Sequence, residues 1–186
     1  MSIAGLLLTP GFGGTRDGAP LVAVEKAVAP LPVLRLDLPK TAAPAVAEVR
    51  AQAEAFASSL GVGTGDLVLG GRSFGGRMCS MAVAQGLPAA GLVLLSYPLH
   101  PPGRPDTLRV AHLPDIHVPV LAVSGSTDPF GSPDELTAHL AAIPGPVTTV
   151  FLPGPHLPTS ATAVATAVRD WLASLHDPDG PPTLRP

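Results

Sequence analysis

A serine flanked by glycines is the residue in this chain best suited to chemistry. Residues 71–76 read Gly-Arg-Ser-Phe-Gly-Gly, so Ser73 lies in the pattern Gly-x-Ser-x-Gly. An apolar run precedes it and predicts a strand, whereas the segment Arg77 to Gln85 predicts a helix. A serine at such a sharp turn takes a strained backbone, and glycine neighbours leave room for it. Ser73 is therefore a candidate nucleophile; the alternative is an ordinary turn in a chain with 20 glycines.

A serine nucleophile needs a base, and the base needs an acid that orients it. His156 follows the last apolar run, and it is the one histidine of six that lies in the final loop. Asp128 follows the run Val118–Val123, and loops at the carboxyl ends of parallel strands meet at one edge of a sheet. A turn aspartate and a surface histidine are the alternatives. Asp134 is a rival acid, but it is better explained as a first-turn residue of a helix.

The segment Thr9–Gly14, Thr-Pro-Gly-Phe-Gly-Gly, could supply part of an oxyanion hole. Phe74 follows the candidate nucleophile at a helix start, where backbone N–H groups have no partner inside the helix. We expect the N–H groups of Phe12 and Phe74 to hold an oxyanion while His156 activates Ser73 and then water, which is two-step acyl transfer. A phosphate-binding loop is the weaker alternative, because no Gly-Lys-Ser/Thr follows.

Three further side chains are candidate substrate contacts: Arg72, His100 and Arg104. An anionic substrate becomes plausible if Arg104 or Arg109 points into the site. Surface or structural ion pairing is the alternative for each arginine. Arg77 lies within the predicted helix, where we expect a structural role.

Six short apolar runs predict the strands that must position these residues. They alternate with amphipathic stretches, which favours one parallel sheet flanked by helices. The runs are Ile3–Leu8, Val33–Leu36, Leu67–Gly70, Gly91–Ser96, Val118–Val123 and Val147–Leu152. The irregular stretch Tyr97–Pro119 leaves the expected active edge, and long irregular loops in compact domains are often functional.

Start signals mark four of the helices between these runs. Asp17 can cap the first, and Pro44 can open the second. Ser132 with Glu135 forms a capping signature, and the last helix is expected from about Thr159.

Length and composition limit the alternatives. A chain of 186 residues with 46% hydrophobic residues predicts one domain, residues 1–176, followed by a flexible proline-rich tail, residues 177–186. The net charge of −3 gives no electrostatic reason to bind nucleic acid or an anionic membrane. Cys79, the single cysteine, is expected in the core. With no targeting or membrane-spanning segment evident, we expect a cytoplasmic protein that needs no metal or cofactor.

The combination of these motifs resembles the α/β-hydrolase superfamily, specifically its small dienelactone-hydrolase-like branch. Within it, the chain is most similar to compact bacterial hydrolases grouped with the mammalian testis-expressed and histone-acetyltransferase-complex hydrolase-like proteins. The similar stretches are Leu8–Gly14, Gly70–Arg77, Ser96–Gly103, Val118–Gly131 and Gly154–His156.

The resemblance implies a single-domain α/β-hydrolase fold without the superfamily's first two strands and without a large lid. It also implies the triad Ser73, Asp128 and His156. True dienelactone hydrolases use a cysteine nucleophile, so Ser73 argues against that substrate. We expect a monomeric or homodimeric serine hydrolase that cleaves a small ester, thioester or related acyl compound. The alternative is a catalytically weak or inactive binding or scaffold protein on the same fold.

Overall fold

Six parallel strands form the centre of the structure, a computed structural model that describes residues 3–176. The strands are β1 (Gly5–Thr9), β2 (Val33–Arg35), β3 (Leu67–Arg72), β4 (Gly91–Leu95), β5 (Val120–Gly125) and β6 (Val147–Leu152). Their order across the sheet is β2-β1-β3-β4-β5-β6, and every neighbouring pair is parallel. The predicted α/β class and six-stranded parallel sheet are confirmed. Most strand bounds differ from the predicted runs by only one or two residues.

The strand order reverses direction between β1 and β3. The chain moves outward from β1 to β2 and then returns past β1 to β3. Thr9 pairs with Gly71 at the carboxyl ends of these two strands, so the loops that follow β1 and β3 leave the sheet side by side. Ligands of open α/β sheets bind at this kind of switch point.

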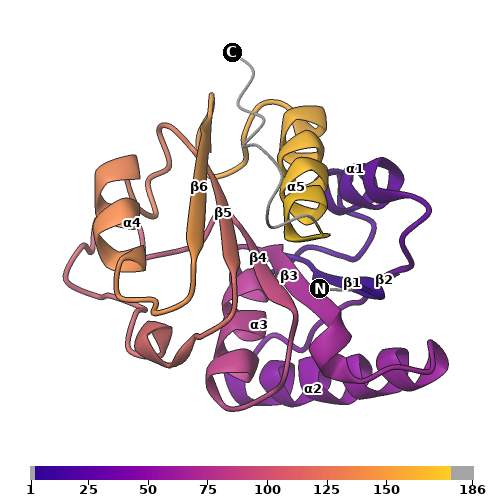
Figure 1. Ribbon diagram of the computed structural model, residues 1–186. Coiled ribbons are helices and arrows are strands. Elements are labelled where there is room, and N and C mark those ends of the chain that lie inside the picture. The colour runs from indigo at the N-terminus through magenta and orange to yellow at the C-terminus, as the bar shows by residue number, and fades with distance from the viewer. Residues whose placement is uncertain (1–2, 177–186) are drawn as a thin grey trace.

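Helices cover both faces of the sheet (Figure 1). On one face α1 (Ala19–Val28) lies beside α5 (Ala161–His176). On the other lie α2 (Ala42–Ser59), α3 (Phe74–Ala84) and α4 (Pro133–Leu140). Alternate strand residues feed two cores, because successive side chains point to opposite faces: Leu6 and Leu8 pack towards α1 and α5, and Leu7 towards α2 and α3.

The helix starts partly agree with the sequence signals. Ser132 and Glu135 form the predicted capping box at α4. The first helix begins differently, because Gly18 takes the capping position of α1 and the Asp17 carboxylate instead lies 2.8 Å from Arg35 on β2. The strand carrying Arg35 passes close to this turn, so an ion pair competes with helix capping.

The stretch Tyr97–Pro119 is irregular apart from one short 3-10 turn, η2 (Leu113–Asp115); a second such turn, η1 (Thr64–Asp66), precedes β3. The irregular stretch is nevertheless well anchored. The Tyr97 hydroxyl donates to the Arg109 carbonyl at 2.6 Å, and Leu99 and Leu113 are fully buried. Buried apolar side chains of this size each stabilise the fold by about 1.5–3 kcal/mol. The loop is therefore anchored to the body of the domain by buried side chains and a hydrogen bond.

Two expectations concern the ends of the chain and its membrane behaviour. The predicted tail, residues 177–186, lies outside the described residues. None of the helices within residues 3–176 combines the length and apolar character needed to cross a bilayer.

Candidate active site

Ser73 lies at the turn between β3 and α3, in a backbone conformation that side-chain-bearing residues rarely adopt. Its φ and ψ angles are 48° and −115°. The turn is held by the Ser73 N–H, which donates to the Leu95 carbonyl at 2.7 Å, and by the Arg77 N–H, which donates to the Ser73 carbonyl at 3.0 Å. A Cβ on Gly71 or Gly75 would collide with the end of β1. The glycines are therefore required by the close approach of the two loops.

The structure brings the predicted nucleophile, base and acid into one hydrogen-bonded chain. His156 Nε2 lies 2.8 Å from Ser73 Oγ, and His156 Nδ1 lies 2.8 Å from Asp128 Oδ2. The carboxylate can only accept, so Nδ1 carries the proton and Nε2 is free to accept from the serine hydroxyl. This tautomer is the one that general-base catalysis by His156 requires.

The Asp128 carboxylate has two further partners that the sequence analysis missed. Its side chain is fully buried and accepts from the Ser124 hydroxyl at 3.3 Å and from the Phe130 N–H at 2.8 Å. The Phe130 ring also lies against the His156 ring, with centroids 4.0 Å apart. These contacts hold both the acid and the imidazole. Only the position of Ser124 in the strand before Asp128 could have indicated this role.

The two predicted oxyanion residues lie on facing loops. Within residues 3–176, neither the Phe12 N–H nor the Phe74 N–H has a hydrogen-bond acceptor. The rings of the two residues meet edge to face, 5.9 Å apart, and the Phe12 side chain is 68% exposed. An oxyanion hole needs two amides that are free to donate, and this role of Phe12 and Phe74 stays a prediction.

A cavity of about 510 Å³ opens beside Ser73 and His156. Its other lining residues are three aromatic rings, a proline and four cationic side chains: Phe12, Phe74, Phe130, Pro98, Lys40, Arg72, Arg77 and Arg109. This volume is within the range of sites for small molecules. The cavity can therefore bring a small substrate to the serine.

Of the three predicted substrate contacts, Arg72 lines this cavity. It leaves the end of β3 directly before Ser73, and its guanidinium packs against Gly11 in the loop after β1. Burial lowers the pKa of Arg72, and the negative charge of Asp128 opposes that shift. Arg72 therefore packs against the loop after β1 and lies within the electrostatic influence of Asp128.

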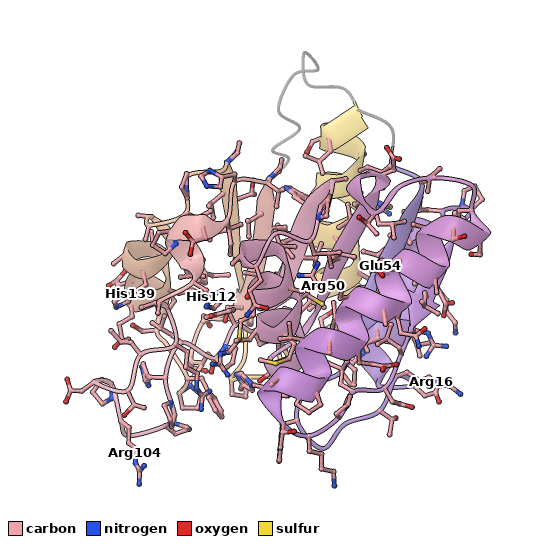
Figure 2. The ribbon with its side chains drawn as sticks, turned by 90° about the horizontal axis from the view of Figure 1, so that it is seen from below. Arg16, Arg50, Glu54, Arg104, His112 and His139 are labelled. Carbon is pink, nitrogen blue, oxygen red and sulfur yellow. The ribbon has the colours of Figure 1, made fainter. Side chains whose placement is uncertain are left out.

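His100 and Arg104 do not line the cavity, and their prediction as substrate contacts is not supported by their positions. His100 is buried, with Nδ1 against the Pro101 carbonyl at 2.9 Å and Nε2 3.6 Å from Glu135 on α4. Arg104 is exposed and projects away from the body of the molecule (Figure 2). Both follow β4, but the loop turns His100 inward against α4 and carries Arg104 outward.

From the sequence, Arg77 is expected to be structural, Arg109 is a candidate for either substrate binding or ion pairing, and Lys40 carries no signal. All three line the cavity. Arg77 is four residues after Ser73, and this spacing places two residues on the same side of a helix. That spacing was the available signal for Arg77. The position of Arg109 depends on the fold of the long loop, which no local pattern indicates.

A second serine–histidine pair lies away from the cavity. Ser80 Oγ is 2.8 Å from His112 Nε2, where the long loop crosses α3 (Figure 2). Ser80 is fully buried, so a substrate cannot reach it. Burial, and then the positive charge of Arg77, lowers the pKa of His112 to about 4. This pair fastens the loop to the helix.

The cysteine thiol and clusters of metal-binding side chains are two other possible sites of chemistry. Cys79 is buried beneath the turn, as predicted, and burial raises the pKa of its thiol to about 12. Within the described part of the chain, no three His, Cys, Asp or Glu side chains gather so that they could hold a metal ion.

Residues 36–156 match the sequence model of a family described as the alpha/beta hydrolase domain. The match spans more than half of the chain and includes all three residues of the Ser73–His156–Asp128 chain. The protein therefore belongs to the alpha/beta hydrolase family, as the sequence resemblance implied. No curated protein sequence matches it significantly.

Solved structures of this family share the fold at low sequence identity. Est1E from Butyrivibrio proteoclasticus superposes with a TM-score of 0.76 at 18% identity, over 94% of this chain and 89% of that one. A dienelactone hydrolase from Anabaena variabilis superposes with a TM-score of 0.74 at 19% identity, over 92% of this chain and 86% of that one. RedJ, a thioesterase of the prodiginine pathway in Streptomyces coelicolor, superposes with a TM-score of 0.66 at 18% identity, over 91% of this chain and 84% of that one.

Proposed function

We propose that this protein is a serine hydrolase that cleaves a small ester, thioester or related acyl compound through an acyl-enzyme. The observation that carries the proposal is the continuous chain from Ser73 Oγ through His156 to Asp128, with both links at 2.8 Å, beside an open cavity. The names of a dienelactone hydrolase and a thioesterase among proteins with this fold are consistent with acyl chemistry.

In the proposed mechanism each residue of the site has a step. As Ser73 Oγ attacks the carbonyl carbon, its proton passes to His156 Nε2, and the buried Asp128 stabilises the imidazolium. The N–H groups of Phe12 and Phe74 donate hydrogen bonds to the carbonyl oxygen as negative charge develops on it. His156 then gives the proton to the departing alcohol or thiol.

The second half of the reaction reuses the same groups. Water enters the cavity, loses a proton to His156 Nε2 and attacks the acyl carbon. The bond to Ser73 Oγ breaks, the serine recovers its proton and the free acid leaves. The cavity volume of about 510 Å³ favours short acyl groups.

We expect the Ser73→Ala variant to lose hydrolysis of short p-nitrophenyl esters, because the acyl-enzyme cannot form. The rate should fall by about 10⁴-fold or more, as for other triad members. Circular dichroism should show an intact fold. Undiminished turnover in a folded variant would overturn the assignment.

A fluorophosphonate probe separates an enzyme from an inactive binding protein on the same fold. We expect the probe to label the wild-type protein and not the Ser73→Ala variant. A Ser80→Ala variant is the matched control, since its buried hydroxyl should leave the labelling unchanged. Absence of labelling in a folded wild-type sample would instead favour the scaffold alternative.

A further inference from the structure

The cavity beside Ser73 carries charge of one sign. Lys40, Arg72, Arg77 and Arg109 line it. Within residues 3–176 no carboxylate does so, because Asp128 is enclosed behind His156. A low-dielectric cavity with only positive charge attracts anions.

Arg77 and Arg109 form the most unusual part of this wall. Arg77 comes from α3 and Arg109 from the loop after β4. Burial, and then the neighbouring positive charge of Arg77, lowers the pKa of Arg109. Two guanidinium groups that repel each other across a half-buried wall cost stability unless an anion binds between them.

Neither guanidinium is satisfied by the protein. In the described part of the chain, neither Arg77 nor Arg109 forms an ion pair with a carboxylate. Among residues 3–176, Arg77 Nε is buried without an acceptor, and the one acceptor of Arg109 Nη1 is the Pro98 carbonyl at 3.5 Å. Guanidinium groups that line a cavity without a carboxylate partner favour a ligand that accepts hydrogen bonds.

Both arginines are held in place relative to the serine. The Arg77 N–H donates to the Ser73 carbonyl, so its helix starts at the nucleophile. The Arg109 backbone is fixed by the buried Tyr97 hydroxyl and by a hydrogen bond from its N–H to the Leu99 carbonyl at 2.9 Å. These bonds fix the backbone of both arginines, so only their side chains need to be ordered when a ligand binds.

We propose that Arg77 and Arg109 bind a carboxylate carried by the substrate, so that the enzyme prefers short anionic esters to neutral esters of equal length. This rests on the proposed hydrolysis at Ser73. The planar guanidinium matches a carboxylate with two parallel hydrogen bonds. The chemistry at the carbonyl is unchanged: water cleaves the acyl–oxygen bond and yields the free acid and the alcohol.

The first test compares 4-nitrophenyl hydrogen adipate with 4-nitrophenyl hexanoate, which differ in the terminal carboxylate. We expect kcat/KM to favour the anionic ester by about tenfold or more, since hydrogen bonds to charged groups are strong. Arg109→Gln and Arg77→Gln should each lower the ratio of the two kcat/KM values, anionic over neutral ester, by about tenfold, while Arg109→Lys should retain part of the preference. Arg104→Gln is the matched control, because Arg104 lies outside the cavity and should leave the ratio unchanged.

A second set of substrates carries the charge on the leaving group. It consists of 4-acetoxybenzoate, its methyl ester and 4-acetoxyphenyl phosphate. An Arg109-dependent preference for a carboxylate in either set supports the proposal and locates the charge on the acyl or the alcohol side. A higher kcat/KM for 4-acetoxyphenyl phosphate than for either 4-acetoxybenzoate or 4-nitrophenyl hydrogen adipate would overturn the assignment to a carboxylate.

Two failures can be told apart. Equal turnover of neutral and anionic esters, unaffected by the arginine variants, would overturn the carboxylate site and leave the hydrolase intact. If no ester is cleaved and the fluorophosphonate does not react, the hydrolase proposal fails. Calorimetric titration of folded Ser73→Ala protein with adipate then decides: binding that weakens about tenfold with Arg109→Gln supports the site, and no binding overturns it. Arg109 is only partly buried, so this variant should fold even if Arg77→Gln does not.

Discussion

At the scale of single residues, the site depends on one strained position. Ser73 has a φ of 48°, which places its hydroxyl above the sheet within 2.8 Å of His156. Gly71 and Gly75 permit this because no side chain fits between the turn and the end of β1. The strain is balanced by hydrogen bonds at both sides of the turn and by the buried helix behind it.

The residue-scale prediction concerns Asp128. Its carboxylate accepts from His156 Nδ1, so replacing it by an amide removes the partner that fixes the tautomer. We expect Asp128→Asn to lower kcat by about 10⁴-fold with little change in KM. Steady-state kinetics on a short p-nitrophenyl ester measures this effect.

The control for this variant is Ser124→Ala, which removes only one outer hydrogen bond, of 3.3 Å, to the same carboxylate. Its kcat should fall by about tenfold at most. An Asp128→Asn enzyme as active as Ser124→Ala would contradict the orienting role.

At the level of helices and loops, two kinds of contact set the course of the chain. Helix starts depend on neighbouring residues, whereas the long loop depends on distant ones. The α4 helix begins where the capping signature predicts, because the side chains of Ser132 and Glu135 each accept a hydrogen bond from the other's backbone N–H. The loop after β4 has no such signal, and its course is set by side chains that reach across the fold, such as the Tyr97 hydroxyl on the Arg109 carbonyl. The loop thereby delivers one arginine to the cavity and leaves another in solvent.

The element-scale prediction tests the cap of α4. Ser132→Ala removes the side chain that accepts from the Glu135 N–H, and also the hydroxyl that donates to the Glu135 carboxylate at 2.7 Å. We expect the free energy of unfolding to fall by about 1 kcal/mol. Urea denaturation followed by circular dichroism measures it.

Thr137→Ala provides a matched change in the same helix, since Thr137 is exposed and its hydroxyl bonds only to the Pro133 carbonyl. That variant should be within about 0.5 kcal/mol of wild type. Equal losses in the two variants would show that the cap contributes nothing special.

At the scale of the whole molecule, the sheet order gathers residues from distant parts of the chain. The loops after β1, β3, β4, β5 and β6 all leave the carboxyl edge of one parallel sheet. Ser73 and His156 are 83 positions apart in sequence and in hydrogen-bond contact. Folding of the whole domain is therefore a condition for the site, and its stability bears directly on activity.

The whole-molecule prediction is a pH dependence of stability. His112 has a folded pKa of about 4, below the ordinary value of about 6.5, so the unfolded chain takes up a proton more readily. The contribution of His112 to stability is complete above about pH 6.5, falls as the pH drops towards 4 and is lost below it.

We expect the free energy of unfolding to decrease less between about pH 7 and pH 4.5 in His112→Gln than in wild type. The glutamine can still hydrogen-bond to Ser80 but does not titrate. Urea titrations at both pH values measure the difference, and His139→Gln, on the surface helix α4, is the control. The same pH dependence in His112→Gln and wild type would contradict the assignment.

The strands and the order of the chemical groups along the chain could be predicted from the sequence. Short apolar runs predicted the six strands, because buried parallel strands need no polar alternation. The three residues of the hydrogen-bonded chain could be predicted because each follows a predicted strand and lies in a glycine-containing loop or turn. They are Ser73, Asp128 and His156. Such signals depend on neighbours in sequence.

Which charged side chains line the cavity could not be predicted from the sequence. His100 and Arg104 follow the expected strand but turn away, whereas Arg77, Arg109 and Lys40 line the cavity. Likewise, the Phe130 ring lies against the His156 ring, with centroids 4.0 Å apart, through a contact between residues distant in sequence. The direction of a side chain in a long loop depends on distant contacts, and those exist only once the sheet and helices have packed together.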